Sequence, residues 1–127
     1  MSAEVFVPGP LPGMNEIIAA AKSGRGKGNA YSRMKKQWGE TVWALAKSAR
    51  LPKCEGPVSV LFCWREKDRR RDIDNVAAAA KFILDGLVKA GVIANDNQQT
   101  VFSIEHRFTV DKRKPGVLVI VGPACPF

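Results

Sequence analysis

Apolar residues recur along the chain in two different periods, and the changes of period mark the predicted elements. Residues 31–49 carry apolar side chains at every third or fourth position, which predicts an amphipathic helix that ends before Pro52. Residues 73–87 repeat this spacing and predict a second helix, closed by Gly91 at its carboxyl end. Residues 15–22 are expected to form a shorter helix near the beginning of the chain.

Four other segments have the patterns of strands. Residues 58–64, VSVLFCW, are apolar on both faces and predict a central strand, while residues 5–7 could open the sheet before a proline-rich segment. Residues 100–110 alternate, with His106 on the apolar side, and predict a half-buried strand. Residues 117–121 are expected to complete a hairpin with that strand. The histidine is interpreted as a core or interface residue in preference to a catalytic one.

The order strand, helix, strand, helix, strand, strand predicts an α+β fold in which helices cover a mixed sheet. A length of 127 residues suits one compact domain spanning residues 1–127. No apolar run approaches the ~18 residues that would span a membrane, and the first residues lack a signal pattern. We therefore expect no membrane partner.

The net charge of +8 is concentrated in the first part of the chain. Residues 1–71 hold 14 Lys and Arg against 6 Asp and Glu, whereas residues 72–127 hold 6 against 6. This asymmetry favours a nucleic acid partner, because Lys and Arg release counterions when they neutralise phosphates. Lys35 and Lys36, on the basic face of the first long helix, could line DNA, although a basic face can also simply be solvated.

Two kinds of cofactor site are not expected from the sequence. Three cysteines without CxxC spacing and a single histidine favour neither a zinc site nor disulfides, and fit a reducing cytosol. The basic loop 23–29 is rich in glycine but matches neither GxxxxGK[ST] nor GxGxxG, so no nucleotide cofactor is predicted.

The segment DRRRDIDN at residues 68–75 places three arginines directly before two aspartates. At about 100° per residue, Lys81 and Asp85 fall within ~20° of Asp74 on one helical stripe. Asp72 lies at the junction of loop and helix, and Asp96 could join these carboxylates only through the tertiary fold. One interpretation is a helix start with acidic caps and solvated arginines.

The other interpretation is a metal and phosphate site. Carboxylates placed together repel unless a cation lies among them, and Mg²⁺ commonly binds through one or two carboxylates plus a substrate phosphate. Arg69, Arg70 and Arg71 would then hold the phosphate backbone of the substrate.

The motif RRRDIDN resembles that of the RusA family of Holliday junction resolvases. The resemblance continues through Lys81, Asp85-Gly-Leu, Lys89-Ala-Gly91 and Asn95-Asp96-Asn97-Gln98, and so covers residues 69–98. It implies a RusA-like nuclease domain over residues 1–127, in a homodimeric, Mg²⁺-dependent endonuclease. Such an enzyme nicks opposing strands of a four-way DNA junction in recombination and repair, and would lie in the bacterial cytosol, encoded by the bacterium or by a phage or prophage.

The resemblance also assigns roles to individual residues. Asp72, Asp74 and Asp96 fall on the family's metal-binding aspartates, and Lys81 on its active-site lysine. The family lysine commonly follows the second aspartate by four residues, where this chain has Ala78, and Lys81 follows by seven.

Two alternatives to a junction resolvase remain open from the sequence. The protein could be a non-catalytic binder of DNA junctions or duplex, with structural carboxylates. It could also be a less specific endonuclease that cuts flaps or other branched DNA. Dependence of turnover on Mg²⁺ separates the first alternative from a nuclease, and comparison of substrates separates the second.

Overall fold

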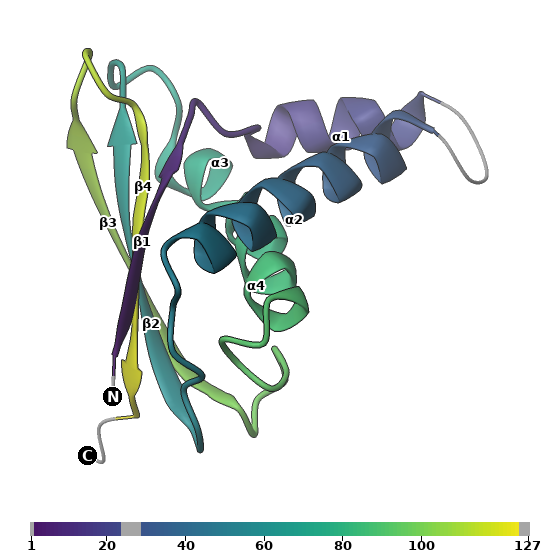
Figure 1. The fold of residues 1–127 in the computed structure, drawn as a ribbon. Helices are drawn as coiled ribbons and strands as arrows, with labels where there is room; N and C mark the ends of the chain where they lie inside the picture. Colours follow the sequence, from purple (N-terminus) through teal and green to yellow (C-terminus); the bar gives the residue numbers. More distant parts are fainter. Residues whose placement is uncertain (1, 24–28, 125–127) are drawn as a thin grey trace.

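The chain folds into one sheet with helices on one side (Figure 1). The computed structural model describes residues 2–23 and 29–124, and most of the predicted basic loop 23–29 lies outside them. The strands are β1 (Ala3–Pro8), β2 (Val58–Glu66), β3 (Val101–Val110) and β4 (Gly116–Pro123). The helices are α1 (Met14–Lys22), α2 (Ala30–Ser48), α3 (Ile73–Ala77) and α4 (Ala80–Lys89).

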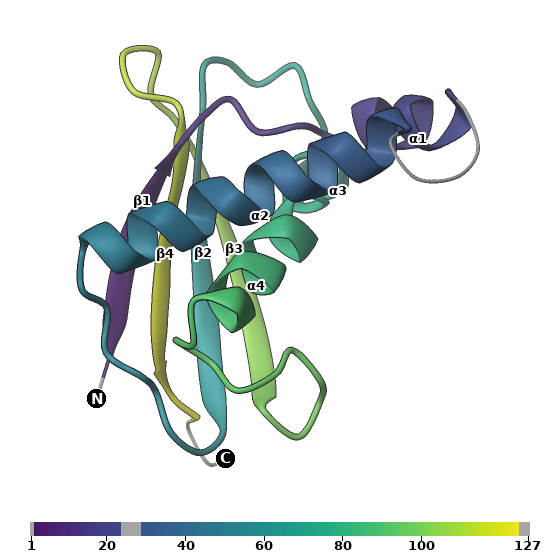
Figure 2. The same ribbon diagram turned by 45° about the vertical axis from the view of Figure 1, so that its right-hand side comes forward.

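The four strands lie in the order β1-β4-β2-β3. β4 pairs antiparallel with β1 and with β2, and β2 pairs in parallel with β3. Figures 1 and 2 show the helices packed over the same face of this sheet. The predicted α+β class, mixed sheet and element order are confirmed. The two helices predicted before the central strand are α1 and α2, and the single helix predicted after it is divided into α3 and α4.

The predicted hairpin between the last two strands is wrong. Instead of pairing with β3, β4 crosses the sheet and lies between β1 and β2. The burial of the two strands explains the difference. Val117, Val119 and Val121 are at most 1% exposed, so this strand takes a central position, whereas the amphipathic β3 occupies an edge.

The predicted helix over residues 73–87 is interrupted at Ala78 and Ala79, which separate α3 from α4. Both residues keep right-handed helical backbone angles, and Phe82 N–H donates to Ala79 O at 3.0 Å, a bond of the tighter three-residue type. Asp74 and Lys81 therefore lie on different helices, and their relative position follows from tertiary packing.

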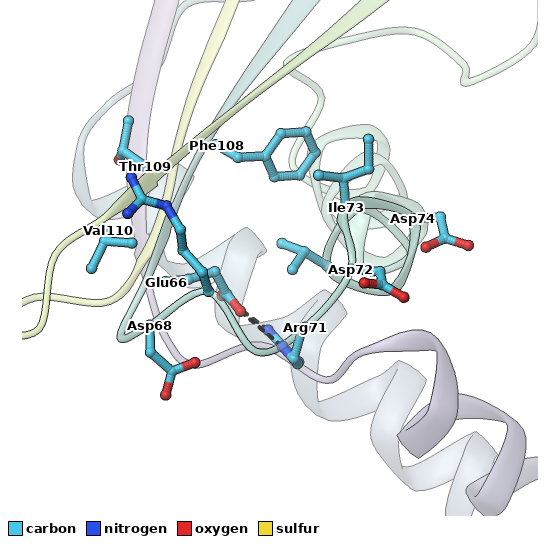
Figure 3. A pocket seen from close by; sticks show the side chains of 11 residues that line it. Glu66, Asp68, Arg71, Asp72, Ile73, Asp74, Phe108, Thr109 and Val110 are labelled. Atoms are coloured by element: carbon cyan, nitrogen blue, oxygen red, sulfur yellow. Dashed lines mark hydrogen bonds and ion pairs between the residues drawn. The ribbon is translucent and has the colours of Figure 1, made fainter.

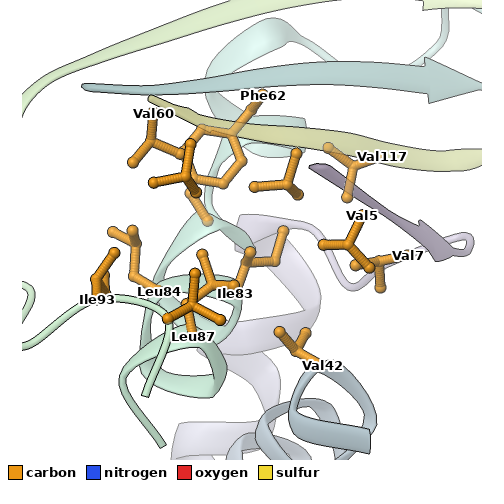
Figure 4. Packing of buried hydrophobic residues seen from close by; sticks show 14 of the residues in the cluster. Val5, Val7, Val42, Val60, Phe62, Ile83, Leu84, Leu87, Ile93 and Val117 are labelled. Carbon is orange, nitrogen blue, oxygen red and sulfur yellow. The ribbon is translucent and has the colours of Figure 1, made fainter. Parts of the chain in front are cut away.

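The core lies between the helices and the inner face of the sheet (Figure 4). Phe62 and Trp64 of β2 are at most 1% exposed and belong to one buried cluster with Ile83 and Leu87 of α4. Burial of each such side chain stabilises the fold by about 2–3 kcal/mol. At its end α4 turns through Gly91, whose φ of 78° confirms the predicted C′ glycine.

Gly86 allows α2 and α4 to approach closely, and its substitution is expected to destabilise the protein. A methyl group at Gly86 would lie 2.5 Å from Cβ of Val42. We expect Gly86→Ala to lower the free energy of unfolding by about 1–3 kcal/mol, measured by urea denaturation. Gly39→Ala is the matched helical control, because no atom lies within 4 Å of its added methyl group, and it should stabilise by up to about 1 kcal/mol. Equal effects of both substitutions would contradict this assignment.

Candidate active site

The arginine-rich segment after β2 is held by ion pairs within the chain. The guanidinium of Arg71 binds Glu66 through two hydrogen bonds, Nε to Oε1 at 2.8 Å and Nη2 to Oε2 at 2.9 Å. Its Nη1 donates to the carbonyl of Leu11 at 3.0 Å. The hydrogen bond to Glu66 is the main reason that the pKa of Arg71 is raised. Arg71 thus ties the segment to the end of β2 and to the residues before α1.

The beginning of α1 packs against the same segment. Asn15 N–H donates to Oδ1 of Asn75 at 3.1 Å. A Cβ on Gly13 would lie 2.5 Å from that same oxygen and 2.8 Å from Nη1 of Arg71, so only glycine fits here without displacement. The helix that carries Asp74 is therefore positioned by residues about sixty positions earlier in the chain.

Asp72 and Asp74 line a cavity of about 560 Å³ between α3 and the carboxyl ends of β2 and β3. Asp72 is the N-cap residue of α3, but its carboxylate makes no capping hydrogen bond, and both aspartates are exposed. In Figure 3, Phe108 and Ile73 face each other across the cavity, and the two carboxylates lie on the α3 side. The other lining residues are Glu66, Asp68, Arg69, Arg71, Val76, Thr109 and Val110.

The remaining arginines of the motif are solvent-exposed. The side chain of Arg70 is 89% exposed, and its Nε lies 3.7 Å from Oδ2 of Asp68. Arg69 is also exposed, and it lines the cavity. Asp68 also accepts a hydrogen bond from the backbone N–H of Arg70 at 3.0 Å, which stabilises the turn. Arg69 is thus available to solvent on the cavity that holds the two aspartates, and Arg70 is available to solvent beside Asp68.

Lys81, Asp85 and Asp96 form a second charged group. Nζ of Lys81 lies 2.9 Å from Oδ1 of Asp85 and 3.3 Å from Oδ2 of Asp96. The hydrogen bond to Asp85 is the largest cause of the raised pKa of Lys81. Oδ2 of Asp85 is buried and has no hydrogen-bond partner within the described residues. Asp85 therefore depends on the lysine to compensate its partly desolvated charge.

The structure brings the predicted site residues together in these two groups. Asp72 and Asp74 share the cavity with Arg69 and Arg71, and Asp96 contacts Lys81. Across residues 2–23 and 29–124, no three His, Cys, Asp or Glu side chains are close enough to hold one metal ion. The carboxylate pair at α3 is nevertheless suited to Mg²⁺, which can bind through one or two carboxylates plus phosphate.

The basic face of α2 lies beside the second group. Lys35 and Lys36 line a hollow of about 320 Å³ between α2 and α4, together with Asp85 and Lys89. Both lysines are exposed. This places cationic side chains next to the pair formed by Lys81 and Asp85, a relation that the sequence pattern alone does not show.

His106 belongs to the apolar face of β3, as predicted. Its Nδ1 accepts a hydrogen bond from Nε1 of Trp64 at 2.9 Å, and its ring stacks on Phe62 at 5.1 Å and on Phe108 at 6.2 Å between centroids. Burial lowers the pKa of His106, because charge is unfavourable among these rings. A structural histidine explains this geometry.

The lowered pKa of His106 predicts a pH dependence of stability. Just below the ordinary histidine pKa of about 6.5, His106 binds a proton in the unfolded chain but stays neutral in the folded chain, because burial lowers its pKa there. The free energy of unfolding should therefore fall as the pH drops below about 6.5, measured by urea denaturation at a series of pH values. His106→Asn retains an acceptor for Trp64 but cannot titrate, and should remove this dependence between pH 6.5 and ~5. An unchanged pH profile in that variant would exclude His106 as its source.

Several residues of this region could not be identified from the sequence. In the sequence, Glu66 is the polar end of a buried strand, but in the structure it binds Arg71, which also donates to the carbonyl of Leu11 near the beginning of the chain. The opposite charges of Glu66 and Arg71, five residues apart, were the sequence feature that could have indicated this ion pair. Phe108 and Val110 line the cavity from β3, a position that depends on the parallel pairing of β2 and β3.

A basic α+β domain that places arginines beside paired carboxylates has the features of an enzyme acting on a nucleic acid backbone. A family model described as endodeoxyribonuclease RusA matches residues 10–122 of the 127, so the chain belongs to this family. No curated protein matches the chain. The family predicted from the RRRDIDN motif is confirmed.

Membership defines the chain as an endodeoxyribonuclease of the Holliday junction resolvase class, which acts on branched DNA. Nucleases of this kind generally use a divalent metal. In the part of the chain that the structure describes, no helix has the length and apolar character needed to cross a membrane.

Proposed function

We propose that this protein is an Mg²⁺-dependent, homodimeric endonuclease that resolves four-way DNA junctions by paired symmetric nicks, in DNA recombination and repair. The observation that carries the proposal is the position of Asp72 and Asp74 on one cavity with Arg69 and Arg71, in a chain of the RusA family. Carboxylates and arginines together suit a phosphate bridged to a protein by a metal ion.

Asp72 and Asp74 would hold Mg²⁺, whereas Asp96, the third ligand implied by the resemblance, lies in the second charged group with Lys81. The free carboxylate of Asp72 supports this role, because its oxygens are not used to cap α3. When bound, the ion would polarise the scissile phosphate and lower the pKa of a water molecule. Asp96 already contacts Lys81, which connects the third aspartate to the proposed active-site lysine.

Lys81 would stabilise the negative charge that develops on the phosphate during cleavage. Its raised pKa keeps the ammonium group charged, and Asp85 and Asp96 fix its position. A charged donor held in place before the substrate binds needs little reorganisation during the reaction.

Arg69 and Arg70, with Lys35 and Lys36 of α2, would bind the DNA backbone. All four are exposed, and contacts to phosphate position DNA without reading its sequence. Arg71, also expected to act at this surface, would mainly hold the segment through Glu66. A four-way junction has two-fold symmetry, so a C2 homodimer would offer one site to each of two opposing strands.

Cleavage of a synthetic mobile four-way junction tests this function. Linear duplex with the sequences of the same arms is the matched substrate, and each is incubated with and without Mg²⁺. We expect paired, symmetric nicks in the junction only, and only with Mg²⁺. Tight junction binding without cleavage under any divalent metal would support the non-catalytic binder, and equal cleavage of flaps would support the less specific endonuclease.

A further inference from the structure

The edge strand β3 exposes apolar side chains on the face that elsewhere forms the core. Phe102 is 52% exposed, Ile104 44% and Val110 37%. In the part of the chain that the structure describes, β3 pairs only with β2. An exposed edge is normally protected by lysine, proline or a bulge. Residues 103–110 contain neither lysine nor proline, and their register with β2 is regular.

Within the described residues, no strand pairs with the outer side of β3 at residues 104–110. Asp111 N–H donates to the carbonyl of Glu66 at 2.8 Å. Because the backbone groups of alternate residues point to the same side of a strand, residues 105, 107 and 109 direct theirs toward β2. Residues 104, 106, 108 and 110 direct their N–H and C=O groups toward the open edge, where a further strand could pair.

We propose that β3 pairs antiparallel with β3 of a second copy of this chain, with His106 on the two-fold axis. This inference rests on the homodimer in the proposed function and assigns its interface. An antiparallel pair centred on residue 106 uses the outward backbone groups of residues 104, 106 and 108. It would join the two sheets into one and place the exposed apolar side chains of the two β3 strands side by side on the same face.

Charge and shape select this register. With His106 on the axis, Glu105 lies opposite Arg107 of the other copy twice, and Ile104 lies opposite Phe108. On the outer face of one chain, Nε of Arg107 lies 2.6 Å from Oε2 of Glu105. In the dimer, these two charges and the two of the other copy would therefore alternate in sign around the axis. An axis at residue 108 would place Glu105 opposite Asp111, and an axis at residue 104 would place Arg107 opposite Val101.

A second copy fits this edge better than an unrelated partner, because the strand is complementary to itself. The polar face carries Ser103, Glu105, Arg107 and Thr109. In the antiparallel pair, Ser103 of one copy lies opposite Thr109 of the other, and Glu105 lies opposite Arg107. On the apolar face, Ile73 of α3 is 65% exposed and faces Phe108 across the cavity, so it extends the apolar surface toward the axis (Figure 3).

Charge-reversal variants test the interface through association. Glu105→Arg and Arg107→Glu each place like charges opposite one another in a self-pair, and each should raise the dimer dissociation constant by at least about tenfold. An equimolar mixture of the two restores acid opposite base, so it should form a heterodimer with nearly wild-type affinity. The measurement is analytical ultracentrifugation over a concentration series, with one variant carrying a fluorescent label.

Rescue in the mixture cannot come from the ion pair within one chain, because each variant carries two like charges on its own β3. Hydrogen exchange gives a second measurement without substitution, in which the amides of residues 104, 106 and 108 should be protected only at concentrations that support the dimer. A monomeric wild type, or variants that associate as the wild type does, would overturn the proposal. If the variants associate as the wild type does and the junction is still cleaved, only this interface is rejected. A monomeric wild type that cleaves the junction would reject the homodimer of the proposed function as well, and a dimer without cleavage would reject the nuclease activity alone.

Discussion

Asp74→Asn is expected to reduce cleavage of a four-way junction by on the order of a thousandfold, with junction binding retained or improved. Stabilisation of a phosphate transition state by a bound metal contributes several kcal/mol, and each 1.36 kcal/mol corresponds to a factor of ten in rate. Asn75 N–H donates to Oδ1 of Asp74, a bond that the amide oxygen of asparagine can also accept, so α3 should remain folded. Single-turnover cleavage and gel-shift binding measure the two quantities.

Asp111→Asn is the matched control for that variant. Asp111 also accepts backbone hydrogen bonds, from Arg113 and Lys114 in the turn before β4, and it does not line the cavity. Its cleavage rate should remain close to that of the wild type. If Asp74→Asn also lost junction binding while its fold was unchanged, the aspartate would serve DNA binding, and the metal assignment would be wrong.

Lys81→Met is expected to lower the cleavage rate by about 10²–10³-fold, because removal of one positioned electrostatic donor has an effect of this size. Methionine keeps most of the length of the side chain but removes the ammonium group. The rate constant of a single turnover at saturating protein should fall, while the affinity for the junction changes little.

The substitution also leaves Asp85 without its partner, so stability must be measured beside activity. Thermal unfolding of Lys81→Met and of the double variant Lys81→Met/Asp85→Asn separates the two effects, since the double variant removes the uncompensated charge. Recovery of cleavage in the double variant would show that Lys81 is only structural. Lys53→Met, in the connection between α2 and β2, is the exposed-lysine control and should cleave normally.

The sequence predicts those parts of the fold that depend on local periodicity. The helix at residues 31–49 and the buried strand at residues 58–64 are found within a few residues of their predicted bounds as α2 and β2. The hairpin failed because proximity in sequence favours pairing of β3 with β4, whereas burial of three valines on β4 favours a central place. Periodicity reports which face of a strand is apolar but does not identify its neighbours.

In the candidate site, too, the sequence predicts contacts between residues close together in the chain but not contacts between distant segments. The spacing of Asp72 and Asp74 predicts that they share a helix start, and the i,i+4 spacing of Lys81 and Asp85 predicts that they share a face. The contact of Lys81 with Asp96 spans fifteen residues and requires the turn after α4. Arg71 binds Glu66 and the carbonyl of Leu11 because three separate segments pack together. The pattern of residues along the sequence does not show which segments pack against one another.

The central place of β4 also bears on how the chain reaches its native state. β1 is synthesised first, yet the one strand that pairs with it among residues 2–23 and 29–124 is β4, more than one hundred residues later in the chain. Until β4 has left the ribosome, β1 has no strand beside it and β2 lacks one of its two partners. The sheet therefore closes late and through distant contacts, which favours slow folding after synthesis over folding by stepwise addition of neighbouring elements.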